Sequence, residues 1–277
     1  MKNVLVTGNK GFIGKRLEEK LKSLGYSVVG IDDEYLQNED WVTELKNILD
    51  TVKPGFVFHV GACSDTLETD SNFMMVRNYQ TTKVISDWCH EHIAILVYSS
   101  SAANYGDNGL YPSNLYGWSK YIAEDYCLKK NNCIALRYFN VYGPGESHKG
   151  RMASVAYNSF VKNKQNISVK LFPKNPKRDF VYIEDIVNAN IFAMQNHVFI
   201  PKFNYYEVGS GIARSFEDVL NNLSIPFSYT DENEIPNGYQ FYTCSDSNKW
   251  MPDWKPEFDL ENGIKDYLIF LEKTYVN

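Results

Sequence analysis

The fold of this chain is decided near its amino terminus, by the stretch Val4-Leu5-Val6-Thr7-Gly8-Asn9-Lys10-Gly11-Phe12-Ile13-Gly14. The apolar run at its start predicts a buried strand, and the spacing that follows predicts a helix. On the turn between them, Gly8 would permit the tight bend, Gly11 the approach of a pyrophosphate to backbone N–H groups, and Gly14 close helix packing. The stretch therefore predicts a dinucleotide-binding turn with the candidate cofactor residues Gly8, Gly11, Phe12, Ile13 and Gly14.

Strands and helices alternate from this turn onward. We expect strands at residues 4–6, 27–31, 56–60, 93–98 and 134–139, and helices at 12–24, 41–52 and 71–92, with one more that carries Tyr116. Strands that are almost wholly apolar and alternate with helices are typical of a parallel sheet covered on both faces. We predict an α/β fold, a Rossmann-type doubly wound parallel sheet.

The alternation loosens after about residue 140, which indicates a smaller C-terminal substrate-binding lobe. Here we expect helices at 153–161 and 259–275 and a short strand at 169–172, whereas segments 180–183 and 203–208 are expected to return to the main sheet. Residues 1–140 with 180–210 would form the dinucleotide-binding domain. Residues 141–179 with 211–277 would form the lobe.

Composition restricts the class of partner. A net charge of −6 and a pI near 5.5 argue against a nucleic-acid or membrane surface and leave room for a small phosphorylated substrate. No CxxC pair is present, so the cysteines predict neither a disulfide framework nor a metal site, and we expect buried thiols. The chain starts directly with a strand and has no long apolar run, so we expect a cytoplasmic protein.

Two carboxylates follow the second expected strand. Asp32 lies about 20 residues beyond the glycine turn, where an acid accepts hydrogen bonds from the adenosine ribose, and Asp33 adds a second negative charge. Both would repel a 2′-phosphate. Charge therefore favours NAD, with Lys10 the only nearby cation that could favour NADP.

The third expected strand ends in small residues at the rim where open parallel sheets bind ligands. They would let the backbone approach a cofactor, although a tight exit from the strand explains them equally well. The candidate cofactor residues are Val60, Gly61, Ala62, Cys63 and Ser64.

Ser101, Tyr116 and Lys120 form a set suited to hydride transfer. Tyr116 and Lys120 share one face of a helix because they lie one turn apart, and the ammonium and the helix dipole would both favour the phenolate of Tyr116. Tyr116 would take a hydroxyl proton, Ser101 would orient the oxygen, and Lys120 would hold the nicotinamide ribose.

This combination resembles the extended short-chain dehydrogenase/reductase superfamily. Longer matches resemble its ADP-L-glycero-D-manno-heptose 6-epimerases, over the segments 61–64, 78–80, 137–144, 148–156 and 177–182. The resemblance implies a bound nicotinamide cofactor, usually NADP, and a nucleotide-sugar epimerase that oxidises the heptose at C6″ and returns the hydride to the other face. It also implies a homo-oligomer.

The resemblance implies the remaining site residues too. It makes Tyr116 the base for one face of the sugar and Lys149 the base for the other, although a lysine in such a loop is usually only solvated. Arg178 would bind the diphosphate, unless it forms a surface ion pair with Asp179. The other implied residues are Asn78 and Val141 at the cofactor and Asn140, Arg151, Asn158, Phe172 and Tyr239 at the substrate.

Several positions depart from the family pattern. Arg77, Arg151, Asn158 and Gly238 replace an asparagine, a serine, a histidine and an arginine, and the family's cofactor lysines after Asp32 are missing. Ala102 and Ala103 argue against a 4,6-dehydratase and a decarboxylase, which need carboxylates there. A hexose 4-epimerase stays open, as does a cofactor-sensing protein without catalysis.

Overall fold

The computed structural model describes residues 3–107, 109–202, 204–235 and 239–275, and these fall into two compact units. Unit 1 comprises residues 1–137, 187–206 and 251–254, and unit 2 comprises residues 138–186, 207–250 and 255–277, apart from the positions outside the described ranges. Gly238 and Phe203, which figure in the sequence predictions, lie outside these ranges. The assignment of one domain to the cofactor and one to the substrate stays a prediction.

A six-stranded sheet in the order β2-β1-β3-β4-β5-β9 forms the centre of unit 1. β1 pairs in parallel with β2 and β3, and β3 in parallel with β4. The predicted Rossmann-type α/β fold is therefore confirmed. The strands are β1 (Val4–Thr7), β2 (Val28–Ile31), β3 (Phe56–His59), β4 (Ile95–Ser101), β5 (Cys133–Tyr138) and β9 (Tyr205–Val208).

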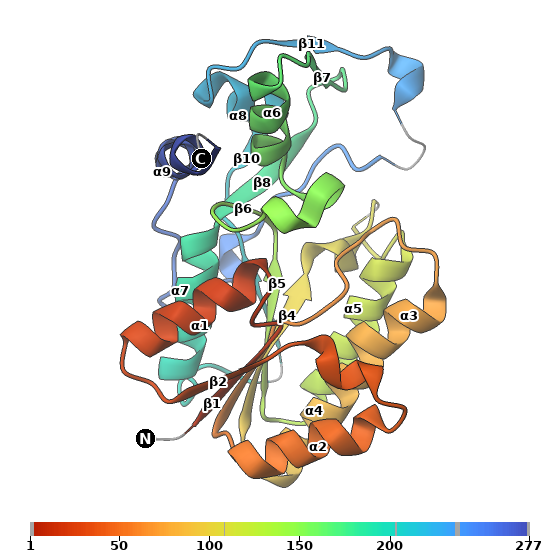
Figure 1. Cartoon of the computed structure of the whole chain (residues 1–277), viewed down its shortest axis with the longest axis vertical. Coiled ribbons are helices and arrows are strands. Elements are labelled where there is room, and N and C mark those ends of the chain that lie inside the picture. The colour runs from red at the N-terminus through yellow and green to blue at the C-terminus, as the bar shows by residue number, and fades with distance from the viewer. Residues whose placement is uncertain (1–2, 108, 203, 236–238, 276–277) are drawn as a thin grey trace. The chain divides into compact units, whose positions relative to one another are not determined.

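Helices cover both faces of this sheet, α1 and α7 on one side and α2, α4 and α5 on the other (Figure 1). A buried cluster that includes Leu45 of α2, Ile85 of α4 and Ala123 of α5 packs on Leu5, Val57 and Leu96 of the strands. The helices are α1 (Phe12–Ser23), α2 (Trp41–Val52), α3 (Ser71–Met75), α4 (Thr81–Glu91), α5 (Leu115–Leu128) and α7 (Ile183–Gln195).

The helix expected at 71–92 is present, but a π-helical turn, Val76–Gln80, separates α3 from α4. Single π turns inside α-helices often mark functional sites. Here the turn carries Arg77 and the buried Asn78.

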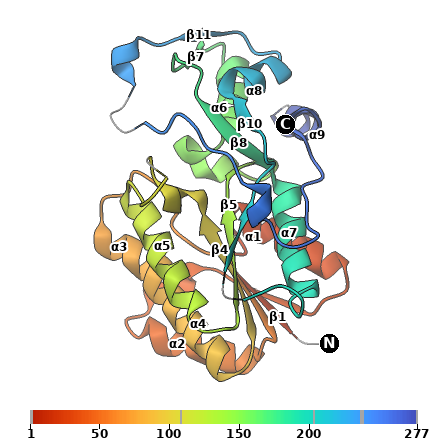
Figure 2. The same cartoon turned by 180° about the vertical axis from the view of Figure 1, so that it is seen from behind.

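Unit 2 contains two small sheets, with strand orders β10-β8-β6 and β11-β7. The prediction that segment 180–183 returns to the main sheet is wrong, because β8 pairs with β6 and β10, whereas β9 does join the main sheet. Figure 2 shows β8, β10, α6, α8 and α9 from behind. The elements are β6 (Asn140–Tyr142), β7 (Val169–Leu171), β8 (Lys177–Tyr182), β10 (Ala213–Ser215), β11 (Phe227–Tyr229), α6 (Val155–Lys164), α8 (Phe216–Asn222) and α9 (Leu260–Tyr275).

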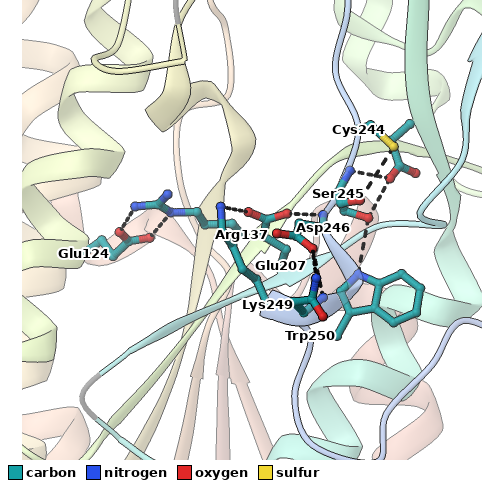
Figure 3. A network of polar contacts seen from close by, with 10 residues as sticks. Glu124, Arg137, Glu207, Cys244, Ser245, Asp246, Lys249 and Trp250 are labelled. Carbon is teal, nitrogen blue, oxygen red and sulfur yellow. Dashed lines mark hydrogen bonds and ion pairs between the residues drawn. The ribbon is translucent and has the colours of Figure 1, made fainter.

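A buried ion pair joins α5 to β5 in unit 1. The Arg137 guanidinium donates to both carboxylate oxygens of Glu124, from Nε at 2.9 Å and Nη2 at 2.5 Å (Figure 3). Both residues are at most 5% exposed. The same carboxylate accepts from Ser100 of β4 at 2.6 Å and from Asn104 at 3.2 Å, so three consecutive elements of the fold meet at Glu124.

Replacing Glu124 by alanine should strongly destabilise the protein, because it leaves the Arg137 charge buried without its partner. Breaking such pairs costs about 3–5 kcal/mol. The free energy of unfolding, measured by denaturant titration, checks this value.

Asp125→Ala is the matched control on the same helix. Asp125 pairs with Lys129 at 2.6 Å where both side chains are more than half exposed, so its loss should cost under about 0.5 kcal/mol. Equal effects of the two changes would contradict the assignment.

Candidate functional site

The glycine turn has the close backbone contacts that a cofactor cradle needs. Gly8 has φ +66°, and a Cβ there would lie 2.6 Å from Cα of Gly61. A Cβ on Gly14 would lie 2.1 Å from the carbonyl oxygen of Gly8. Side chains are therefore excluded at both positions, which lets the backbone segments of the turn lie this close together. The turn fits a dinucleotide pyrophosphate.

The loop after β3 is held against this turn by polar contacts. The backbone N–H of Gly61 donates to Oγ1 of Thr7 at 3.0 Å, and Thr7 is hydrogen-bonded to Nδ1 of His59 at 2.7 Å. His59 is buried, and burial lowers its pKa to about 3, so its ring is neutral.

Both polar atoms of the Asn78 side-chain amide are hydrogen-bonded within the chain. Its Oδ1 accepts from the backbone N–H of Cys63 at 2.8 Å, and its Nδ2 donates to the carbonyl of Cys63 and to Oγ of Ser119. Asn78 thus positions the loop that carries Cys63 next to α5. Direct contact of Asn78 with a cofactor stays a prediction.

A cavity of about 200 Å³ opens beside this turn and includes Gly8, Asp32, Asp33, Gly61 and Arg77 in its lining. The prediction that Lys10 is the only cation near Asp32 and Asp33 is wrong. Arg77 lies 3.3 Å from the Asp33 carboxylate, while Lys10 is paired with Glu34. The sequence offered one signal, since Arg77 stands where the family has an asparagine.

Ser101 and Tyr116 meet at the carboxyl end of β4. The Asn114 side chain accepts from the Gly117 N–H at 2.8 Å and caps α5, so Tyr116 lies in the first turn of the helix, as predicted. The hydroxyls of Tyr116 and Ser101 are hydrogen-bonded, which opposes the rise of the Tyr116 pKa caused by burial.

Gly117 was missed as a site residue. A Cβ there would lie 2.7 Å from the carbonyl oxygen of Ala103, so only glycine lets α5 approach the segment after Ser101 this closely. A glycine inside an expected helix was the available signal.

The electrostatic prediction for Tyr116 is wrong for the chain by itself. Burial raises the pKa of Tyr116, and the contributions that shift it come from burial, Ser101 and Cys63 rather than from Lys120. Lys120 is itself buried, and burial lowers its pKa to about 7 against the opposing charge of Glu124. Its Nζ lies 4.6 Å from the centre of the Tyr98 ring.

Unit 2 holds the residues predicted to bind substrate. Arg178 of β8 lies 5.3 Å from the Tyr239 ring centre, and the rings of Tyr239 and Phe172 are 5.1 Å apart, so these three residues come together. Asn140 accepts from Thr243 at 3.4 Å, and Asn158 donates to the Ala153 carbonyl at 2.8 Å. Val141 is half-buried in β6, and Arg151 is exposed.

Arg178 does not form the surface ion pair with Asp179 that was left open. Both residues are buried, and the Asp179 carboxylate accepts instead from Ser210, Gly211 and Ser245. Burial lowers the pKa of Arg178, and among the described residues no carboxylate neutralises it. A buried cation of this kind suits an anionic ligand.

Glu146 shapes the loop that carries Lys149. Its fully buried carboxylate accepts from the N–H of Gly143 and from the hydroxyl of Ser154. Burial lowers the pKa of Lys149, and the charge of Glu146 opposes this shift. No local pattern marked Glu146, because its donors come from both ends of the loop.

The described residues contain no group of three His, Cys, Asp or Glu side chains that could hold a metal ion, and the five cysteines are free thiols. Cys89, Cys127 and Cys133 are buried, as expected, whereas Cys63 and Cys244 are partly exposed. Within the described part of the chain, no helix is long and apolar enough to span a membrane.

The Lys120 pKa predicts how stability depends on pH. Between about 7 and the ordinary value of 10.5, the unfolded chain binds a proton that the folded chain has lost, so folding is favoured as pH rises. Relative to Lys120→Met, the cofactor-free wild type should gain stability from pH 7 to 9, by at most about 1.4 kcal/mol per pH unit.

Unfolding titrations at several pH values measure this difference. Lys129→Met, which removes an exposed lysine at the carboxyl-terminal cap of the same helix, is the control and should show no such slope. A flat difference for Lys120→Met would refute the shift.

Comparison with known proteins gives a consistent family. Residues 4–209 match the model of the NAD dependent epimerase/dehydratase family. The chain is 35% identical to an ADP-L-glycero-D-manno-heptose-6-epimerase of Brachyspira hyodysenteriae, over 98% of each chain. The crystal structure of the Helicobacter pylori enzyme of that name matches with a TM-score of 0.84 at 29% identity, over 98% of this chain and 96% of that chain.

A UDP-glucose 4-epimerase of Thermotoga maritima matches with a TM-score of 0.86 at 23% identity, over 99% of each chain, which shows a shared fold. The predicted resemblance to the extended short-chain dehydrogenases/reductases is confirmed, and the alternative of a sensor without catalysis loses its support. The chain belongs to the NAD dependent epimerase/dehydratase family.

Proposed function

We propose that this enzyme inverts C6″ of an ADP-linked, or other nucleotide-linked, glycero-manno-heptose by transient oxidation and re-reduction with a bound nicotinamide cofactor. The observation that carries the proposal is the hydrogen bond between Tyr116 and Ser101 in unit 1, with the buried Lys120 one helical turn beyond Tyr116 on α5. The relative that is 35% identical over almost the whole chain supports the choice of sugar.

In this proposal, the phenolic oxygen of Tyr116 takes the proton from the sugar hydroxyl. The bound cofactor supplies the hydride acceptor and, in the return step, the hydride donor. Ser101 is hydrogen-bonded to Tyr116 and orients the sugar oxygen. Lys120 holds the nicotinamide ribose, and with a pKa of about 7 it can gain or lose a proton near neutral pH.

Lys149 is the proposed base for the second face of the transient ketone. A neutral amine can accept a proton, and the lowered pKa of Lys149 increases the neutral fraction. The charge of Glu146 opposes this shift, so the protonated form of Lys149 also remains accessible. The pair is therefore suited to giving and taking one proton in a catalytic cycle.

Unit 2 supplies the groups proposed for the nucleotide end of the substrate. Arg178, buried and without a carboxylate partner among the described residues, would bind the diphosphate. Tyr239 and Phe172 add ring faces beside it, and Asn140, Asn158 and Arg151 are proposed for the sugar. The net charge of −6 makes such a local cation more important for an anionic substrate.

We also propose that the enzyme works in the cytoplasm as a homo-oligomer, with neither a nucleic acid nor a membrane as partner. The acidic composition supports the last point.

A panel of nucleotide sugars tests the function. We expect inversion at C6″ of ADP-glycero-manno-heptose, followed by NMR, and little turnover of UDP-glucose. Tyr116→Phe should lower turnover by about 100-fold or more, since general acid–base catalysis contributes 10²–10⁴-fold, and should leave the cofactor bound.

Tyr121→Phe, on the same helix and in ring contact with Trp118, is the matched control and should keep normal turnover. Normal turnover in Tyr116→Phe would remove Tyr116 from the mechanism. Inversion of UDP-glucose at C4 in place of the heptose would instead identify a hexose 4-epimerase.

A further inference from the structure

The cavity beside the glycine turn carries an ion pair that the proposed reaction does not use. Arg77 of the π turn and Asp33 after β2 both line it, and their charged groups are 3.3 Å apart. Both residues belong to unit 1, as do the glycines of the cradle. The pair therefore lies where a dinucleotide on this turn extends its adenosine ribose.

Arg77 is held in place by a second contact. Its guanidinium carbon lies 3.9 Å from the centre of the Phe73 ring, which lines the same cavity. A cation over an aromatic face keeps its planar donor edge free to turn between acceptors. The Arg77 side chain is 28% exposed, so it is accessible to a ligand, while its ring contact limits its range.

The other charged residues near the cavity differ from Arg77 in their partners and burial. Lys10 is paired with Glu34, and both side chains are more than half exposed. Asp32 is partly buried, and burial together with the neighbouring charge of Asp33 raises its pKa. Arg77 is thus the cation that pairs with a carboxylate of the cavity lining itself.

NAD and NADP differ at this ribose by one phosphate. When NAD presents its free 2′-hydroxyl, Asp33 can keep its ion pair with Arg77, and Asp32 can accept a hydrogen bond from the ribose. A 2′-phosphate would meet two carboxylates, unless a cation changes partner. Guanidinium binds phosphate at two oxygens, which compensates for the loss of one 3.3 Å contact to an exposed carboxylate.

We propose that the Asp33–Arg77 pair sets the choice between NAD and NADP: Arg77 neutralises Asp33 when NAD binds, and turns to the 2′-phosphate when NADP binds. This inference rests on the proposed cofactor site. Arg77 would thus allow NADP to bind where Asp32 and Asp33 alone would repel its 2′-phosphate. Asp33 would compete with that phosphate for Arg77.

Cofactor affinity tests the proposal directly. Protein freed of cofactor is titrated with NAD and NADP by calorimetry, and the ratio of the two dissociation constants is compared among variants. Arg77→Gln should weaken NADP by about tenfold or more and change NAD by less than about threefold, as expected for a charge-assisted hydrogen bond. Asp33→Asn should tighten NADP by a similar factor, because it frees Arg77 and removes one repelling charge.

Lys10→Gln is the control, since it removes a cation from the same rim whose partner lies outside the cavity lining. Its ratio should equal that of the wild type. An unchanged ratio in Arg77→Gln, or an equal loss of both cofactors, overturns the proposal. If the wild type binds neither dinucleotide, the cofactor site itself fails, which separates the two ideas.

Discussion

The buried ion pair of Glu124 and Arg137 is the interaction on which the arrangement of unit 1 depends. A charged pair in the interior is stable only when its remaining hydrogen-bonding groups are satisfied. Here Ser100 and Asn104 donate to Glu124, while the Arg137 guanidinium lies 3.3 Å from the Tyr205 ring centre. The pair therefore fixes the register of α5 against β4 and β5. Because Ser101 is next to Ser100, and Lys120 is one turn before Glu124, the same constraint positions both groups.

Burial also governs the chemistry of the charged groups. It lowers the pKa of Lys120, Lys149 and Arg178, and it raises that of Tyr116. Each buried lysine has an acidic neighbour, Glu124 for Lys120 and Glu146 for Lys149, whose charge opposes the shift. Glu124 lies on α5 in unit 1, whereas Glu146 lies in a loop of unit 2. Both limit how far burial can drive a proton off its lysine.

The fold could be predicted where the determinants are local. The glycine turn needs Gly8 and Gly14 for reasons of backbone geometry, and the apolar spacing of α1 follows the helical period. Segment 180–183 was assigned to the wrong sheet because an apolar strand reads the same whichever partners it has. Sequence spacing does not encode that choice, which is made by long-range pairing.

The site shows the same division. Tyr116 was correctly assigned to the first turn of its helix, because the spacing to Lys120 is local, but its electrostatics were not, because burial is a property of the whole fold. Arg77 reaches Asp33 from a π turn, far along the chain, and Glu146 collects donors from Gly143 and Ser154. These residues became visible only when distant segments were brought together.

In the proposed reaction, a hydride leaves C6″ of the sugar and returns to the same carbon without exchanging with water. The most direct test is turnover of ADP-glycero-manno-heptose in deuterated water, with the product examined by NMR and mass spectrometry. We expect an inverted product without deuterium at C6″. Deuterium incorporated at that carbon would show that a proton, and not a hydride, is removed, and would contradict the account.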